Sequence, residues 1–236
     1  MVNAGAYTNY NQNGIHIAQQ AKKLFPELTV KATVGFHPID ADALAKSDFS
    51  ALMKALEQQY LTHTAEVIAI GECGIDLHRK EKNLDHQQTL FKLHAELARK
   101  WKLPLIIHSR DAFEETLEVL EEFTELKLYF HCRGYGAAEV KRVEKLFPQV
   151  WLGFTNILSY PSAITTRESL LAVESARILM ETDAPFLPPQ AFRGKMNYPA
   201  YVKNVYTKSA EILGMQEEVL ETLVEEHFFA LFPTIS

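Results

Sequence analysis

Four short apolar runs in this chain each lead into a residue of a type that binds metal ions. The runs VIAIGE, LPLIIH, KLYFH and ARILMETD end at Glu72, His108, His131 and Asp183. Parallel strands that alternate with helices bring their carboxyl ends to one face, and in a (β/α)₈ barrel that face holds the active site. We therefore expect these four side chains to meet at one point, which restricts the fold more than any other feature.

The rest of the chain alternates in the same way, with strand-like runs followed by longer helical segments, which is typical of a parallel sheet built from βα units. Strands are expected at 1–5, 29–36, 66–72, 104–108, 127–131, 150–154 and 177–182, and helices at 11–25, 42–60, 84–101, 112–123, 137–147, 163–174, 199–213 and 216–231. These are seven strands, whereas a closed barrel has eight. We predict an α/β fold of the TIM (β/α)₈ type that lacks its first βα unit and forms one domain over residues 1–236.

The composition is that of a globular protein, with 47% hydrophobic and 23% charged residues. No apolar run approaches the roughly 20 residues that cross a bilayer, so no membrane partner is expected. The N-terminus shows no export signal and two cysteines are too few for a disulfide framework, so we expect a cytoplasmic protein.

The net charge of −6 argues against a globally basic nucleic-acid surface. A locally positive face stays open, because six basic residues follow strand ends, namely Arg79, Lys80, Arg110, Arg133, Arg193 and Lys195.

Glu72, His108 and His131 are expected to bind a divalent metal ion. Their mixed ligand set does not select one metal, since carboxylates suit Mg²⁺ whereas imidazoles suit ions such as Zn²⁺. Mg, Mn and Zn, and one or two ions per chain, therefore stay open. Each residue also has an alternative interpretation when it is considered alone. Glu72 would then be a solvated loop residue, and His108 and His131 would each be a core residue that makes a hydrogen bond.

Asp183 is expected to bind a metal and to act as the catalytic general base, since a carboxylate beside an activated water can take its proton. A turn or N-cap aspartate is the alternative. His37 ends a strand before Pro38 and can contact substrate, approach the metal or make a structural hydrogen bond. Asp76, Arg110 and Asp111 follow the ligands closely and are expected to support them.

The motifs GFHP, IGECGID, IIHSRD, FHC and METDAPFLPP, followed by RGK and N-x-P, resemble in order those of the TatD family of metal-dependent deoxyribonucleases. The resemblance implies an amidohydrolase-like barrel that hydrolyses phosphodiester bonds of DNA as a 3′→5′ exonuclease, with a pair of divalent ions. By motif, Glu72 would bridge the ions, His108 and His131 would complete the shell of one, and Asp183 would bind the other. His37 and Arg193 would lie near the substrate phosphate.

Three departures from the family pattern bear on activity. No H-x-H occurs in this sequence, so the family's opening D-x-H-x-H strand is expected to be absent and the activity to be impaired. HCRGYG replaces H-C-F-S-G, and RGKMNYP carries Met196 and Tyr198 where Arg and Glu are common. Two other functions therefore stay open. One is a non-catalytic barrel used for binding, and the other is an amidohydrolase-like ester or amide hydrolase, such as one that acts on D-aminoacyl-tRNA.

Overall fold

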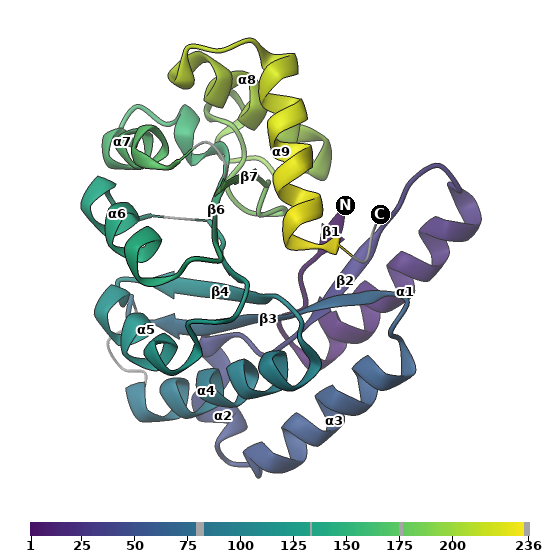
Figure 1. Ribbon diagram of the computed structural model, residues 1–236. Helices are drawn as coiled ribbons and strands as arrows, with labels where there is room; N and C mark the ends of the chain where they lie inside the picture. Colours follow the sequence, from purple (N-terminus) through teal and green to yellow (C-terminus); the bar gives the residue numbers. More distant parts are fainter. Residues whose placement is uncertain (79–82, 133, 175–176, 234–236) are drawn as a thin grey trace. The chain divides into compact units, whose positions relative to one another are not determined.

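A computed structural model describes residues 1–78, 83–132, 134–174 and 177–233 of the chain (Figure 1). The chain falls into two compact units, Met1–Leu128 and Tyr129–Ser236, and each is described by itself. Within the described residues there are seven strands, and strands adjacent in the sequence are also adjacent in the sheet. This confirms the predicted α/β fold with seven parallel strands. None of the described helices is both long enough and apolar enough to cross a bilayer.

The first unit contains a parallel sheet with its helices. Its elements are β1 (Val2–Asn3), α1 (Thr8–Leu24), β2 (Lys31–Val34), a 3₁₀ turn (Pro38–Asp40), α2 (Ala41–Leu44), α3 (Phe49–Thr62), β3 (Val67–Asp76), α4 (Leu84–Trp101), β4 (Leu105–Arg110), α5 (Phe113–Leu120) and a 3₁₀ turn (Glu121–Phe123). β1 pairs with β2, β2 with β3, and β3 with β4, all in parallel. Helices α3 and α4 run along the same side of β3 and β4 (Figure 1).

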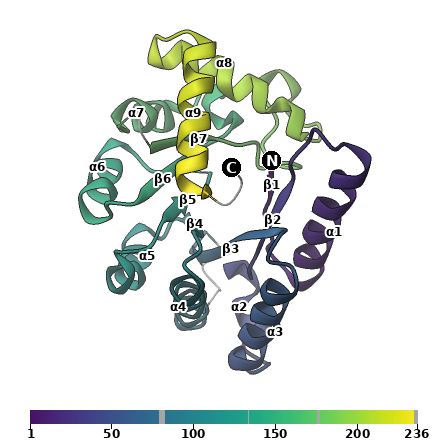
Figure 2. The same cartoon turned by 45° about the vertical axis from the view of Figure 1, so that its right-hand side comes forward.

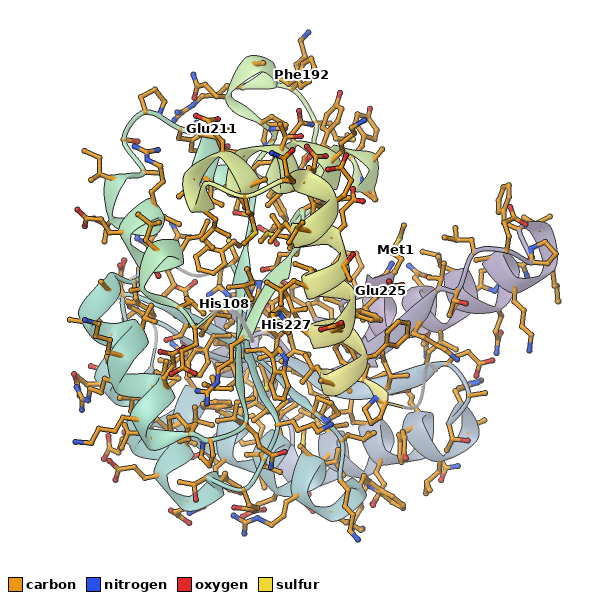
Figure 3. All side chains as sticks on the ribbon, turned by 45° about the horizontal axis from the view of Figure 1, so that its top comes forward. Met1, His108, Phe192, Glu211, Glu225 and His227 are labelled. Atoms are coloured by element: carbon orange, nitrogen blue, oxygen red, sulfur yellow. The ribbon has the colours of Figure 1, made fainter. Side chains whose placement is uncertain are left out.

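The second unit continues the alternation. Its elements are β5 (Leu128–Phe130), which begins at the boundary between the units, α6 (Ala137–Leu146), β6 (Val150–Phe154), α7 (Ile164–Ala172), β7 (Ile178–Met180), α8 (Val202–Leu213) and α9 (Glu217–Leu231), with 3₁₀ turns at Asn156–Ser159, Gln190–Phe192 and Pro199–Tyr201. β6 and β7 pair in parallel. Helix α9 lies beside β7 (Figure 2). Its His227, labelled in Figure 3, hydrogen bonds through Nδ1 with the Ile178 carbonyl at 3.0 Å.

Two expectations about the elements are wrong. Residues 42–60 do not form one helix, because Asp48 caps a new helix by accepting the Ser50 N–H, and local bonds of this kind compete with helix continuation. Glu72 and His108 do not end their strands, since β3 continues to Asp76 and β4 to Arg110. The prediction of a single domain stays a prediction.

Candidate metal centre

Two glycines allow β3 and β4 to approach closely where Glu72 lies. Gly71 and Gly74 have φ values of 125° and 140°, which glycine adopts without the strain that other residues incur. A β-carbon would lie 2.4 Å from a backbone oxygen of β4 at Gly71, and 1.9 Å from one at Gly74. The register of the pair shifts at this point. The strand therefore continues past Glu72 and brings its side chain beside His108.

Glu72, His108 and His37 place their polar atoms close together in the first unit. Glu72 Oε1 lies 3.0 Å from His108 Nδ1 and 3.5 Å from His37 Nε2. Ligand atoms from the three residues lie within 4.8 Å of one another, and the side chains are 14% to 15% exposed. A carboxylate beside two imidazoles at this spacing has the chemistry of a transition-metal or mixed divalent site.

Asp76 contacts His108 through the other ring nitrogen. Asp76 Oδ2 lies 3.0 Å from His108 Nε2, and Oδ1 accepts the His78 N–H at 3.0 Å. Burial acts to raise the pKa of the Asp76 carboxyl, but hydrogen bonding and charge from His108, with smaller effects of His78 and Arg110, lower that pKa overall. The ionised carboxylate favours the His108 tautomer that carries its proton on Nε2. Nδ1 is then an acceptor that can bind a cation.

The hydrogen bonds around His37 indicate a different role for this residue. Ile39 N–H donates to His37 Nδ1 at 3.1 Å, so the neutral ring carries its proton on Nε2, which faces Glu72. A protonated Nε2 cannot bind a cation, whereas it can donate a hydrogen bond to a carboxylate or to a phosphate oxygen. Glu72 and His108 are therefore the candidate cation ligands of this set, and His37 is a candidate hydrogen-bond donor, whose contact with substrate stays a prediction.

In the second unit, the half-buried carboxylate of Glu181 links two strand ends. It accepts the backbone N–H of Cys132, which follows His131, and hydrogen bonds with the Tyr129 hydroxyl. Burial raises the pKa of the Glu181 carboxyl, His131 opposes this shift, and the charge of Asp183 adds to it. His131 and Asp183 therefore both lie near enough to Glu181 to affect its ionisation.

Asp183 and Cys132 adopt backbone conformations that are uncommon for residues other than glycine, with φ values of 55° and 43°. Such conformations cost free energy and are concentrated at functional sites. Asp183 is held by the chain on both sides of it. The buried Asn197 amide donates to the carbonyls of Thr182 at 2.7 Å and Phe186 at 2.6 Å, and Phe186 N–H donates to the Asp183 carbonyl at 2.8 Å.

The structure brings the predicted residues together within each unit. His37, Glu72 and His108 meet in the first unit, whereas His131 and Asp183 lie around Glu181 in the second. Arg193 lies in the loop before α8. Of the basic residues that follow strand ends, Arg79, Lys80 and Arg133 lie outside the described residues.

Sequence reasoning missed two residues of the second unit and the role of a third. Glu181 stands two residues before Asp183 in METDAP, a spacing that was a usable signal for a supporting carboxylate. Tyr129 has the sequence context of an ordinary strand residue, and its contact with Glu181 follows only from the tertiary structure, in which both side chains lie over Gly153 of β6. Asn197 was noted as a family residue, but its bonds to the carbonyls around Asp183 are not visible in the sequence.

Comparison with known proteins identifies the family of this chain. The model of the TatD-related DNase family matches residues 2–233. The chain belongs to this family. Among curated TatD relatives, an uncharacterized metal-dependent hydrolase of Bacillus subtilis, YabD, is 34% identical over 205 residues, which cover 86% of this chain and 77% of the relative. The human 3′-5′ RNA nuclease TATDN2 is 33% identical over 181 residues, which cover 75% of this chain and 23% of TATDN2.

A solved structure supports the barrel-type fold. The crystal structure of YJJV, a TatD homologue from Escherichia coli, matches with a TM-score of 0.86 and 23% identity, covering 98% of this chain and 85% of that chain. At this identity the match establishes the fold alone. It therefore confirms the fold class expected from the sequence, while the absence of a first βα unit stays a prediction.

Proposed function

We propose that this chain is a metal-dependent nuclease that hydrolyses phosphodiester bonds at the 3′ end of DNA. The observation that carries the proposal is the pairing of Glu72 with His108 at 3.0 Å, with Asp76 at 3.0 Å from the other ring nitrogen of His108. Membership of a family whose relatives are named metal-dependent hydrolases supports it. The two cysteines of the chain also fit the proposed cytoplasmic location.

The donor set of the first unit fits a divalent ion. Glu72 supplies a carboxylate oxygen and His108 supplies Nδ1, while the contact of His108 Nε2 with Asp76 has the carboxylate–histidine arrangement common at metal sites. We propose that His131 and Asp183 are metal ligands as well, with Mg, Mn and Zn as candidate metals and one or two ions per chain. A bound divalent ion supplies Lewis acidity to the phosphoryl group and to the attacking water.

The remaining steps belong to side chains of this protein. Asp183 takes a proton from the water that attacks phosphorus, and the bond from phosphorus to the 3′ oxygen of the preceding nucleotide breaks. His37 donates its Nε2–H to a non-bridging phosphate oxygen, and Arg193 pairs with phosphate charge. Glu181 positions His131 through the adjacent Cys132 N–H.

The proposal is tested on the full chain with single-stranded oligonucleotides labelled at the 5′ end, after loading with each candidate metal. We expect stepwise shortening from the 3′ end and a loss of about 10²- to 10⁴-fold in kcat for Asp183→Asn, the range for removal of a general base. Asp85→Asn, on the exposed start of α4, is the control and should retain activity. Metal-loaded protein that shortens no oligonucleotide would reject the proposal.

RNA is a second candidate substrate, because the relative TATDN2 is named a 3′-5′ RNA nuclease. The same assay with matched DNA and RNA strands compares kcat/KM for the two. A higher value for RNA would reassign the substrate but keep the reaction. Calorimetry that detects no divalent ion binding, together with no cleavage, would favour a non-catalytic barrel.

A further inference from the structure

An open pocket of about 490 Å³ in the second unit begins two residues after Asp183. Two loop segments, 185–188 and 193–195, line it together with Tyr160. Its volume lies within the roughly 300–1,000 Å³ of small-molecule sites. Phe186 lines the pocket and is 68% exposed. An aromatic ring that the protein leaves this exposed has most of its surface available to a ligand.

Two cations line the same pocket, although the chain as a whole is acidic. The Arg193 guanidinium lies 4.9 Å from the centre of the Tyr160 ring. The Lys195 ammonium lies 5.9 Å from the centre of the Phe192 ring, which is labelled in Figure 3. Contacts of this type attract the cation to the ring face and limit the positions it samples. The pocket therefore presents positive charge beside the exposed ring of Phe186.

Asn197 holds the aromatic side of the pocket in place. Its side-chain amide donates to the carbonyls of Phe186 at 2.6 Å and Leu187 at 3.2 Å, and its backbone N–H donates to the Pro185 carbonyl at 3.0 Å. The bond from Phe186 N–H to the Asp183 carbonyl closes a β-turn, which keeps the two α-carbons within about 7 Å. Because this turn is held before any ligand arrives, binding requires little additional ordering.

We propose that this pocket binds an unpaired nucleotide of a single-stranded nucleic acid beside the phosphodiester on which Asp183 acts. The base stacks on Phe186, and a phosphate pairs with Arg193 and Lys195. The inference rests on the proposed nuclease function and adds its substrate class, a strand with unpaired terminal bases. Bases inside a duplex are covered by their stacking neighbours, whereas an unpaired base can stack on an aromatic side chain.

The test measures binding separately from cleavage. Metal-free full chain is titrated, in chelator, against a fluorescein-labelled oligothymidine and against the same strand in a duplex, with fluorescence anisotropy as the readout. We expect the single strand to bind more tightly. Phe186→Ala should weaken its binding about tenfold, as expected for loss of one base–aromatic stack, and Phe186→Trp should restore it. Phe229→Ala on α9, outside the pocket lining, is the aromatic control and should bind as the unchanged chain does.

The cations have a separate readout, the dependence of binding on salt concentration. For single strands, the slope of log K against log salt changes by about 0.7 for each phosphate contact. Arg193→Gln and Lys195→Gln should each reduce this slope by about that amount. Lys203→Gln, an exposed lysine on α8, should leave the slope unchanged. Slopes that are equal for all three variants would overturn the phosphate assignment.

Failure of the pocket and failure of the nuclease are distinguishable. Cleavage by metal-loaded protein, combined with equal affinities of Phe186→Ala and the unchanged chain, would overturn the nucleotide pocket and leave the nuclease standing. Selective weakening by Phe186→Ala without cleavage under any metal would support the pocket and reject the nuclease. Equal affinity for single strand and duplex would also overturn the inference. Each variant is compared by circular dichroism, since Phe186 is largely exposed and its truncation should leave the fold intact.

Discussion

We expect Asp76 to favour the His108 proton on Nε2 and so to leave Nδ1 for a cation, which is testable at the scale of one residue. Asp76→Asn keeps the shape but removes the charge that favours the proton on Nε2, so we expect metal affinity to fall about 10- to 100-fold, the range for loss of such a partner. Calorimetric titration of metal-free protein measures it. Asp85→Asn, which removes an exposed carboxylate at the start of α4, should change little. Equal affinities for the two variants would contradict the assignment.

His94 links α4 to the segment that carries His37, and it should make stability depend on pH. It accepts the Phe36 N–H at 3.0 Å and bonds the Leu90 carbonyl at 2.7 Å, and burial lowers its pKa from 6.5 to about 4. Between pH 6.5 and pH 4 the unfolded state therefore binds more protons than the folded state. The stability that the neutral His94 side chain contributes is complete above about pH 6.5 and is lost as the pH falls towards 4.

Replacing His94 by Gln removes the titration while keeping a donor and an acceptor. The stability of the unchanged chain relative to His94→Gln should fall by roughly 3 kcal/mol between about pH 7 and about pH 4, at 1.36 kcal/mol per pKa unit. Urea unfolding at several pH values measures this difference. A difference that does not vary with pH would show that His94 is not held neutral in the folded protein.

At the scale of elements, Gly153 on β6 leaves room for Tyr129 of β5 to meet Glu181, the residue that follows β7. A β-carbon there would lie 2.4 Å from the Tyr129 hydroxyl oxygen and 2.5 Å from Glu181 Oε1. Gly153→Ala should lower the free energy of unfolding by about 1–3 kcal/mol, as overpacking does. Tyr129→Phe removes one clashing atom and should recover part of the loss in the double variant.

Gly134→Ala is the matched control, because a β-carbon at Gly134 has no neighbouring atom within 4 Å among the described residues. Urea unfolding of the single and double variants supplies the comparison. If Gly153→Ala is no more destabilising than Gly134→Ala, the contact between Tyr129 and Glu181 does not occupy this space.

For the whole molecule, the proposed ion should stabilise the fold, because a ligand that binds only the folded state adds free energy by mass action. At a hundredfold excess over Kd the gain is about 2.7 kcal/mol. We expect a rise of several degrees in Tm with the preferred metal and little rise for Glu72→Gln, which removes the carboxylate charge. Glu96→Gln, on the exposed side of α4, should retain the rise. Thermal denaturation with a series of metals measures the rise in Tm of both variants. An equal rise in Glu72→Gln and Glu96→Gln would show that the ion does not bind at Glu72.

Much of the fold was predictable because its signals are local. The limits of α4 and β6 match the expected 84–101 and 150–154, since the first is a long amphipathic segment capped by Asn83 and the second a short apolar run. Prediction was wrong where a local signal was missed or overruled, as at the Asp48 cap and at the glycines that let β3 continue past Glu72. The ligand types at Glu72, His108, His131 and Asp183 were predictable, but their partners were not.

The sequence by itself determined the alternation of strands and helices, the family, and the residue types at the ends of the apolar runs. Only the tertiary structure decided which atoms meet. Glu72 contacts His108 across 36 residues and Cys132 contacts Glu181 across 49. Such contacts depend on strand register and close packing, whereas propensity and periodicity describe neighbours along the chain. For the same reason, the proton position on His37, the neutral state of His94 and the exposure of Phe186 followed from packing and not from the sequence pattern.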